Sequence, residues 1–288
     1  MNFLVITTIL WSLSFSLIGV YLAGQVDAYV SVWVRIALAS VVFLPFLRLK
    51  VVNKTEILQL MMIGGVQLGL MYIFYYQSFL LLSVPEVLIF TVFTPIYVTL
   101  IHDALNKQFN PRYLLTALIA VVGAIVIRYD HLSDDYWLGF LVVQCSNLCF
   151  AFGQVFYKYF KAKRTKLAQR DIFAWFYLGA LVVVSVAWLI WGKAQLPTDP
   201  TQIGILLWLG IVASGLGFFM WNRGASQVDP GTLAIMNNAL IPAGLIVNLT
   251  LWNKDVDIPR LIIGGGIIAL ALVVHSAIKK QQAQKYAV

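Results

Sequence analysis

"PIYVTLIHDALNKQFNPR" spans residues 95–112, and "PAGLIVNLTLWNKDVDIPR" spans residues 242–260. Each stretch begins with Pro, carries Asn-Lys eleven and twelve positions later, and ends on Pro-Arg. The first three landmarks recur at a constant offset of 147 residues, which pairs Pro95, Asn106 and Lys107 with Pro242, Asn253 and Lys254. The closing Pro-Arg recurs after one inserted residue. Such a repeat indicates that the chain contains two related halves.

The composition places this chain in a lipid bilayer. Hydrophobic residues make up 61% of its 288 residues and charged residues only 11%, whereas a soluble domain usually has about a quarter charged residues. A transmembrane helix needs about 20 apolar residues, so roughly ten helices fit if the loops are short. The net charge of +8 favours an anionic lipid leaflet over nucleic acid, because the basic residues lie between apolar runs rather than on one polar face.

Ten apolar runs predict ten transmembrane helices, which makes this an all-α integral membrane protein. The runs lie near residues 2–22, 30–47, 57–79, 84–103, 112–128, 136–157, 172–192, 202–222, 231–252 and 261–278. Ser83 and Glu86 have the spacing of a capping box, and Asp229-Pro230 is typical of a helix start. Pro45, Pro95 and Pro242 lie within or near the ends of spans, where helix kinks are expected.

The distribution of Lys and Arg predicts the orientation of these spans. Fifteen of the 20 basic residues fall on the side that holds both termini, four fall on the opposite side, and Arg35 lies within a span. We therefore expect both termini to be cytoplasmic. Six of the fifteen belong to the linker from Lys158 to Arg170, between the halves.

The repeated stretches end spans four and nine, five helices apart. Because five is odd, the second copy must cross the membrane in the opposite direction, and inverted repeats of this kind are common in secondary transporters. We expect a first repeat at residues 1–130, a second at 134–280 and a basic cytoplasmic tail at 281–288. No nucleophile elbow, P-loop or HExxH motif occurs in the sequence, so we predict no enzyme activity, no cofactor and no metal site.

Arg35 is the outstanding candidate for substrate binding. It lies in the apolar run "VSVWVRIALASVVFLPFL", where burying a guanidinium costs at least about 2.5 kcal/mol, so its side chain should face the interior of the bundle. No acid within a span stands out as its permanent partner. A substrate carboxylate is therefore one interpretation, and an Arg that snorkels or binds backbone carbonyls is the other.

Aromatic and amide side chains supply the remaining candidates. Aromatic residues share helix faces at i, i+3 and i+4 spacing, and adjacent amides precede an intramembrane Pro. Packing or interfacial anchoring is the alternative for each aromatic, and a packing hydrogen bond is the alternative for each amide. The predicted substrate-binding set is Arg35, Trp11, Ser14, Tyr72, Tyr75, Tyr76, Trp221, Asn222, Asn237 and Asn238.

The chain resembles the EamA branch of the drug/metabolite transporter superfamily, whose members have two inverted five-helix repeats. The resemblance covers about residues 1–275. Three stretches, "LWSLSFSLIGVYLAGQVDAY", "FAWFYLGAL" and "GFFMWNRGASQVDPGTLAIMNNALIPAGLIVNL", resemble in particular the members that import biotin. The resemblance implies a secondary transporter of the bacterial inner membrane that takes up biotin with high affinity by alternating access.

Biotin suits the residues found independently. It has a carboxylate for an Arg, an apolar bicycle and chain for aromatic walls, and a ureido group for amides. Amino acids or other small amphiphilic metabolites suit the same residues, so an exporter of such compounds is the alternative. The sequence indicates no obligatory protein partner and leaves the energy coupling open.

Overall fold

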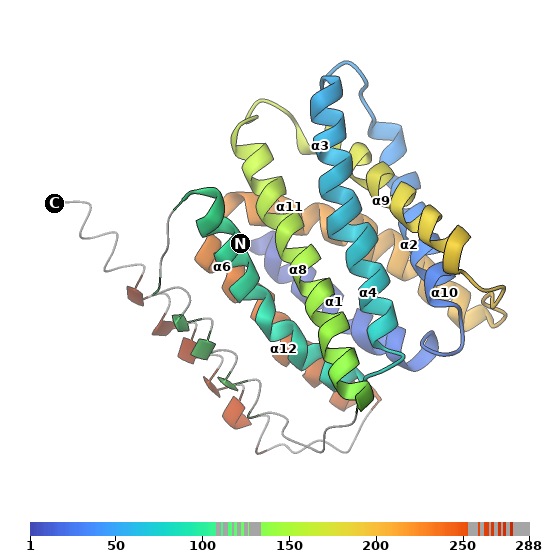
Figure 1. The fold of residues 1–288 in the computed structure, drawn as a ribbon, viewed down its shortest axis with the longest axis vertical. Coiled ribbons are helices and arrows are strands. Elements are labelled where there is room, and N and C mark those ends of the chain that lie inside the picture. The colour runs from blue at the N-terminus through green and yellow to red at the C-terminus, as the bar shows by residue number, and fades with distance from the viewer. Residues whose placement is uncertain are drawn as a thin grey trace.

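The computed structural model describes residues 1–107 and 134–252 continuously, and isolated positions between 111 and 126 and between 259 and 278. Within these residues the protein is helical, and eight helical spans are long and apolar enough to cross a membrane (Figure 1). They coincide with eight of the predicted spans, with ends that differ by a few residues. The other two predicted spans, 112–128 and 261–278, lie largely outside the described residues, so the count of ten remains a prediction.

Several spans consist of more than one helical segment. The first two spans are α1 (Asn2–Tyr21) and α2 (Ala28–Phe43), the latter extended by the 3₁₀ turn η1 (Leu44–Phe46). The third contains α3 (Lys54–Gly64), the π-helical segment η2 (Gly65–Leu70) and α4 (Met71–Ser78). The fourth contains α5 (Val84–Phe90), the 3₁₀ turn η3 (Thr91–Phe93) and α6 (Thr94–Leu105).

The second half also contains both continuous helices and a span made of several helical segments. It contains α8 (Asp134–Ala162) and α9 (Gln169–Trp191), each a continuous helix. The following span consists of α10 (Pro200–Trp208), the π-helical segment η4 (Leu209–Leu216) and α11 (Gly217–Gln227). The last described span is α12 (Pro230–Leu251).

Two helix starts predicted from the sequence are confirmed. The Ser83 backbone N–H donates to Glu86 Oε2 at 2.7 Å, as in a capping box. The Asp229 side chain accepts from the Thr232 N–H at 3.0 Å, so it caps α12. These contacts satisfy backbone donors that a helix terminus would otherwise leave unpaired.

The prolines have different local effects. Pro95 falls in the first turn of α6, directly after η3, so the fourth span changes its helical geometry just before this residue. Pro45 lies in the turn that ends the second span. Pro242, in contrast, lies inside the continuous helix α12. A Pro removes one hydrogen bond of the helix ladder, which membrane helices tolerate when neighbouring groups compensate.

Glycines permit a close crossing of α3 and α9. A Cβ on Gly64 would lie 1.8 Å from the Phe176 carbonyl oxygen, and one on Gly179 would lie 2.0 Å from the Met61 carbonyl oxygen. Both positions therefore require the absence of a side chain where α3 crosses α9. Small residues at helix crossings are typical of membrane proteins, in which packing rather than the hydrophobic effect holds helices together.

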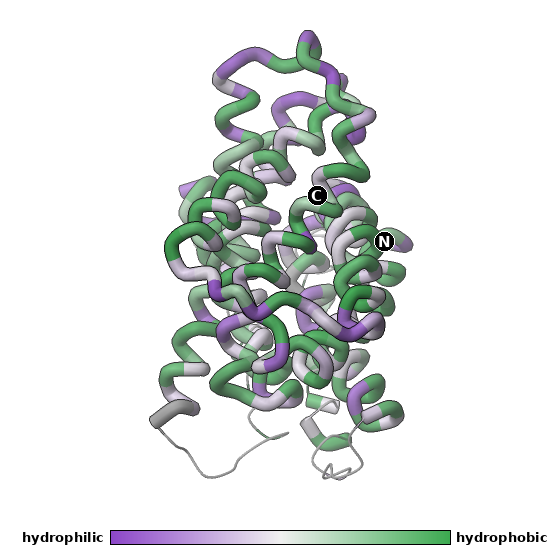
Figure 2. Tube along the Cα trace, turned by 90° about the vertical axis from the view of Figure 1, so that its right-hand side faces the viewer, coloured by the Kyte–Doolittle hydropathy of each residue, from purple (hydrophilic) through white to green (hydrophobic). Residues whose placement is uncertain are grey.

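Loops from different parts of the chain meet at the two ends of the bundle. At one end, the Asp27 N–H donates to the Gln195 carbonyl at 2.9 Å. At the other end, Arg48 lies 3.6 Å from Asp171, and Arg164 forms an ion pair with Glu56. This second end, uppermost in Figures 1 and 2, carries hydrophilic stretches around the start of α3. The loops that carry Arg48 and Arg164, two of those that the charge count groups on one side, therefore lie at the same end.

Candidate substrate-binding cavity

A cavity lies near the middle of the bundle. Seven of the eight described spans contribute to its lining, from both predicted repeats. It encloses about 580 Å³ including its open mouth. Its lining residues are Trp11, Ser14, Phe15, Arg35, Met71, Tyr72, Tyr75, Thr91, Thr94, Ser146, Asn147, Phe150, Phe218, Asn237 and Leu240.

Arg35 lies at one side of this cavity and is only 1% exposed. Its Nε donates to Ser214 Oγ, and its Nη1 donates to the Tyr76 hydroxyl at 3.3 Å. The guanidinium carbon lies 4.2 Å from the centre of the Tyr72 ring, a cation–π contact. No carboxylate of the described residues is within ion-pair distance of Arg35. The positive charge of Arg35 is therefore stabilised by hydroxyl groups and an aromatic face. Several of its five N–H donors remain available for a ligand.

The π-helical segment η4 helps to position Arg35 through Ser214. A π-helix interrupts the regular hydrogen-bond ladder, so carbonyl oxygens need other donors in a membrane. Trp11 Nε1 donates to the Ala213 carbonyl at 2.8 Å. The Tyr177 hydroxyl lies 2.7 Å from the carbonyl oxygens of both Ser214 and Gly215, which share its single proton. Buried aromatic donors thus stabilise the irregular backbone beside the Arg35 guanidinium.

Aromatic rings line the middle part of the cavity. The Trp11 ring centre lies 4.7 Å from that of Phe218 and 5.8 Å from that of Phe150. Tyr75 packs edge-on against Phe15 at 5.4 Å. Rings at these distances and tilts attract one another, which fixes a rigid apolar wall.

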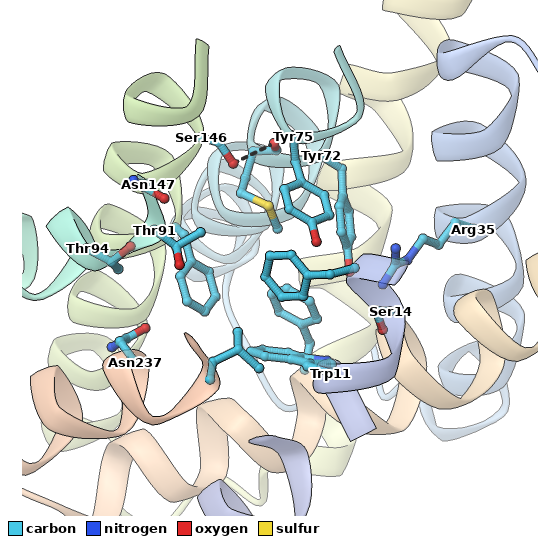
Figure 3. A pocket seen from close by; sticks show the side chains of 15 residues that line it. Trp11, Ser14, Arg35, Tyr72, Tyr75, Thr91, Thr94, Ser146, Asn147 and Asn237 are labelled. Carbon is cyan, nitrogen blue, oxygen red and sulfur yellow. Dashed lines mark hydrogen bonds between the residues drawn. The ribbon is translucent and has the colours of Figure 1, made fainter. Parts of the chain in front are cut away.

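A second group of polar side chains lies across the cavity from Arg35. Figure 3 shows Arg35 and Ser14 on one side of the rings and Asn147, Thr94 and Asn237 on the other. Asn147 Nδ2 donates to the Phe90 carbonyl at 2.8 Å and to Gln144 at 3.2 Å, which fixes the amide. Within the part of the chain that the structure describes, no group donates to Asn147 Oδ1, so this oxygen remains an acceptor.

A layer of buried amides lies next to the cavity, toward the end of the bundle where α3 begins. Gln67 in η2 donates to Asn222 at 3.4 Å. Gln154 and Asn237 contact each other at 3.4 Å, and Trp221 Nε1 donates to Gln154 at 3.1 Å. Gln67 Oε1 and Asn222 Nδ2 are buried without a partner among the residues the structure describes. The layer is therefore closely packed but incompletely hydrogen-bonded.

The structure brings most of the sequence-predicted site residues together. Six of the ten line the cavity: Trp11, Ser14, Arg35, Tyr72, Tyr75 and Asn237. Tyr76 lies behind them and binds Arg35. Trp221 and Asn222 belong to the amide layer, and the Trp221 ring packs at a tilt against that of Trp11, with ring centres 5.0 Å apart. Asn238 is 2% exposed and does not line the cavity.

The remaining polar lining residues were not predicted from the sequence. Ser146 and Asn147 lie in the run "FLVVQCSNLCFAF", and Gln154 of the amide layer follows Asn147 after seven residues, about two turns. Polar residues in an apolar run were the available signal, the same signal that identified Arg35. Thr91 and Thr94 carry no comparable signal, because Thr commonly bonds its own helix backbone. Thr91 Oγ1 does so, donating to the Leu88 carbonyl at 2.6 Å.

The described residues contain no group of three or more His, Cys, Asp or Glu side chains that could hold a metal ion. The cavity supplies instead one buried cation, neutral hydrogen-bonding groups and aromatic rings. It is therefore suited to binding a small amphiphilic anion.

A cavity enclosed by membrane-length helices from two halves of a chain is typical of small-molecule membrane transporters. The family profile of the EamA-like transporter family matches residues 1–129. The biotin transporter of Salmonella typhimurium is 50% identical over 96% of this chain and 92% of its own length, and that of Escherichia coli K12 is equally similar. The probable biotin transporter of Pseudomonas aeruginosa is 48% identical over 96% of this chain and 97% of its own length. The chain belongs to the EamA-like transporter family.

The fold also matches a solved protein crystal structure with a TM-score of 0.75, covering 96% of this chain and 97% of the other. Sequence identity to that protein is 16%, so the match concerns the fold alone.

Proposed function

We propose that this protein imports biotin across the bacterial inner membrane by alternating access. The observation that carries the proposal is the polarity of the central cavity, which has an Arg at one side, a fixed amide at the other and aromatic rings between. Biotin has the same order of groups, with a carboxylate at one end, an apolar chain and ring in the middle, and a ureido group at the other end. Similarity to biotin transporters over nearly the whole chain supports the same substrate.

In the proposed complex, the carboxylate of biotin binds the free N–H donors of Arg35. Trp11, Phe150 and Phe218 contact the chain and the bicycle. Asn147 Oδ1 accepts a hydrogen bond from a ureido N–H, because its own amide donors are already engaged. A charge-assisted hydrogen bond at one end and a neutral one at the other would select against ligands that lack either group.

The proposed architecture is ten helices in two inverted repeats, residues 1–130 and 134–280. Exchange of the repeats would convert the packing of α1 on α12 into the packing of α8 on α6, and both pairs occur. It would likewise convert the packing of α2 on η4 into that of α9 on η2, and both of these also occur. The π-helical segments η2 and η4 fall in the corresponding third and eighth predicted spans. These equivalences support the inverted repeat.

The amide layer is the proposed gate on the side of the bundle where α3 begins. Its Gln67–Asn222 and Gln154–Asn237 contacts are 3.4 Å long, near the limit of a hydrogen bond, so separating them costs little. Rocking of one repeat against the other would open this layer and expose the cavity to that side. The basic loops at this end favour a cytoplasmic position for it, with both termini on the same side.

Equilibrium binding to the purified full-length protein tests the substrate. We expect labelled biotin to bind saturably, unlabelled biotin to displace it, and biotin methyl ester to compete more weakly. Leucine, a zwitterionic metabolite without a ureido group, should not compete. Displacement by leucine with no specific biotin binding would favour the exporter of amino acids instead.

A further inference from the structure

A second cavity lies on the outer surface between α3 and the C-terminal part of α8, away from the substrate site. It encloses about 790 Å³ including its open mouth. Its wall is largely apolar: Met62 is 62% exposed, and the rings of Phe152 and Phe156 stack with centres 4.0 Å apart. In a membrane protein, apolar side chains exposed on the outside of a helical span face lipid chains.

The cavity has a basic mouth at the end of the bundle where α3 begins. Lys163 and Arg164 form this mouth together with Gln59. Arg164 is already paired with Glu56. Lys163 is exposed, its Nζ lies 4.2 Å from the centre of the Tyr159 ring, and no carboxylate of the described chain lies within ion-pair distance. One positive charge at the mouth is therefore left without an anion.

The dimensions of the cavity match one leaflet of the bilayer. Phe152 and Lys163 are eleven residues apart, about 16 Å along a helix, and half of the hydrocarbon core of a bilayer is about 15 Å. A chain that extends from Lys163 past Phe156 to Phe152 would thus run from the polar interface toward the membrane centre. Apolar depth and a basic rim are the two features that an anionic lipid requires.

We propose that this cavity, lined by Met62, Phe152, Phe156, Tyr159 and Lys163, is a binding site for one anionic phospholipid. The lipid phosphate pairs with the Lys163 ammonium, and Gln59 supplies a neutral hydrogen-bonding group beside it. One acyl chain lies against Met62 and the two stacked rings. Because α3 continues into η2, which carries Gln67 of the amide layer, a lipid bound here contacts a helix of the proposed gate.

Native mass spectrometry of the purified full-length protein tests this site, with phosphatidylglycerol as the anionic lipid and phosphatidylethanolamine as the zwitterionic control. We expect phosphatidylglycerol to bind more tightly. Lys163→Gln should weaken its binding about fivefold, which corresponds to about 1 kcal/mol for one juxtamembrane Lys. Lys166→Gln, which removes an equally basic linker residue outside the cavity, should leave binding unchanged.

Two further experiments test whether the cavity binds a whole phospholipid. Met62→Trp places a larger side chain in the cavity. It should weaken phosphatidylglycerol binding without changing the amount of folded protein, because Met62 is exposed on the outer surface. Glycerol 3-phosphate, which has the headgroup chemistry but no acyl chains, should fail to displace the lipid. The proposal is overturned if Lys163→Gln and Lys166→Gln weaken binding equally, if the two lipids bind alike, if glycerol 3-phosphate displaces the lipid, or if the cavity holds a second copy of the chain.

Discussion

Replacing Arg35 tests whether its guanidinium binds the substrate carboxylate. Arg35→Lys keeps the positive charge but loses the planar fork of donors, so it should weaken biotin binding. Arg35→Ala should weaken it further, because a charge-assisted hydrogen bond contributes about 1.5–3 kcal/mol, or roughly ten- to a hundredfold in affinity. The same change also removes the hydrogen bonds from the guanidinium to Ser214 and Tyr76, each of which, as a bond to a charged group, contributes about 1.5–3 kcal/mol to stability.

A thermodynamic cycle separates these two effects. Biotin and biotin methyl ester are each titrated against the wild-type protein and Arg35→Ala, and the amount of monodisperse protein is measured by size-exclusion chromatography. If the guanidinium binds the carboxylate, the substitution weakens biotin much more than the ester, and the coupling free energy is about 1.5–3 kcal/mol. If the substitution weakens the binding of biotin and of the ester by the same factor, the carboxylate contact does not exist and Arg35 contributes only to the stability of the fold.

Three further substitutions test the fold and the cavity. Gly179→Ala places a methyl group 2.0 Å from a backbone carbonyl of α3 and should lower the melting temperature in detergent, whereas Gly204→Ala, with no atom within 4 Å, should not. Tyr177→Phe leaves buried η4 carbonyls without their donor and should cost about 1–3 kcal/mol of stability, while Tyr159→Phe on the exposed surface serves as the control; equal melting temperatures would contradict the role given to Tyr177. Asn147→Leu should weaken biotin binding roughly tenfold; because it also removes the donor to the Phe90 carbonyl, affinity is measured on the folded, monodisperse fraction, and unchanged affinity would show that Asn147 does not bind the ureido group.

The positions of the spans could be predicted from hydropathy because each described span contains a long, predominantly apolar window. Their internal breaks could not. The π-helical segments "GVQLGL" and "LGIVASGL" are apolar and Gly-containing, and nothing local distinguishes them from regular helix. Their geometry depends on donors from other helices, such as Tyr177 and Trp11. Tertiary contacts of this kind have no signature in a single sequence.

The candidate site was predictable to a similar degree. Arg35 stood out because a charge within an apolar run must find polar surroundings. Adjacent amides were harder to assign: Asn237 lines the cavity and Asn238 does not, because successive helix positions are about 100° apart. Asn147 gave the same polar signal within its span as Asn237, and only the packing of α8 against the fourth span shows that it faces the cavity.

Uptake of labelled biotin by a biotin-auxotrophic bacterial strain that produces this protein tests the central claim most directly. The account predicts saturable accumulation above the empty-vector level and growth on limiting biotin, both reduced in a strain that produces Arg35→Ala at equal membrane abundance. No accumulation above the empty vector, from protein that is folded and present in the inner membrane, would contradict biotin import.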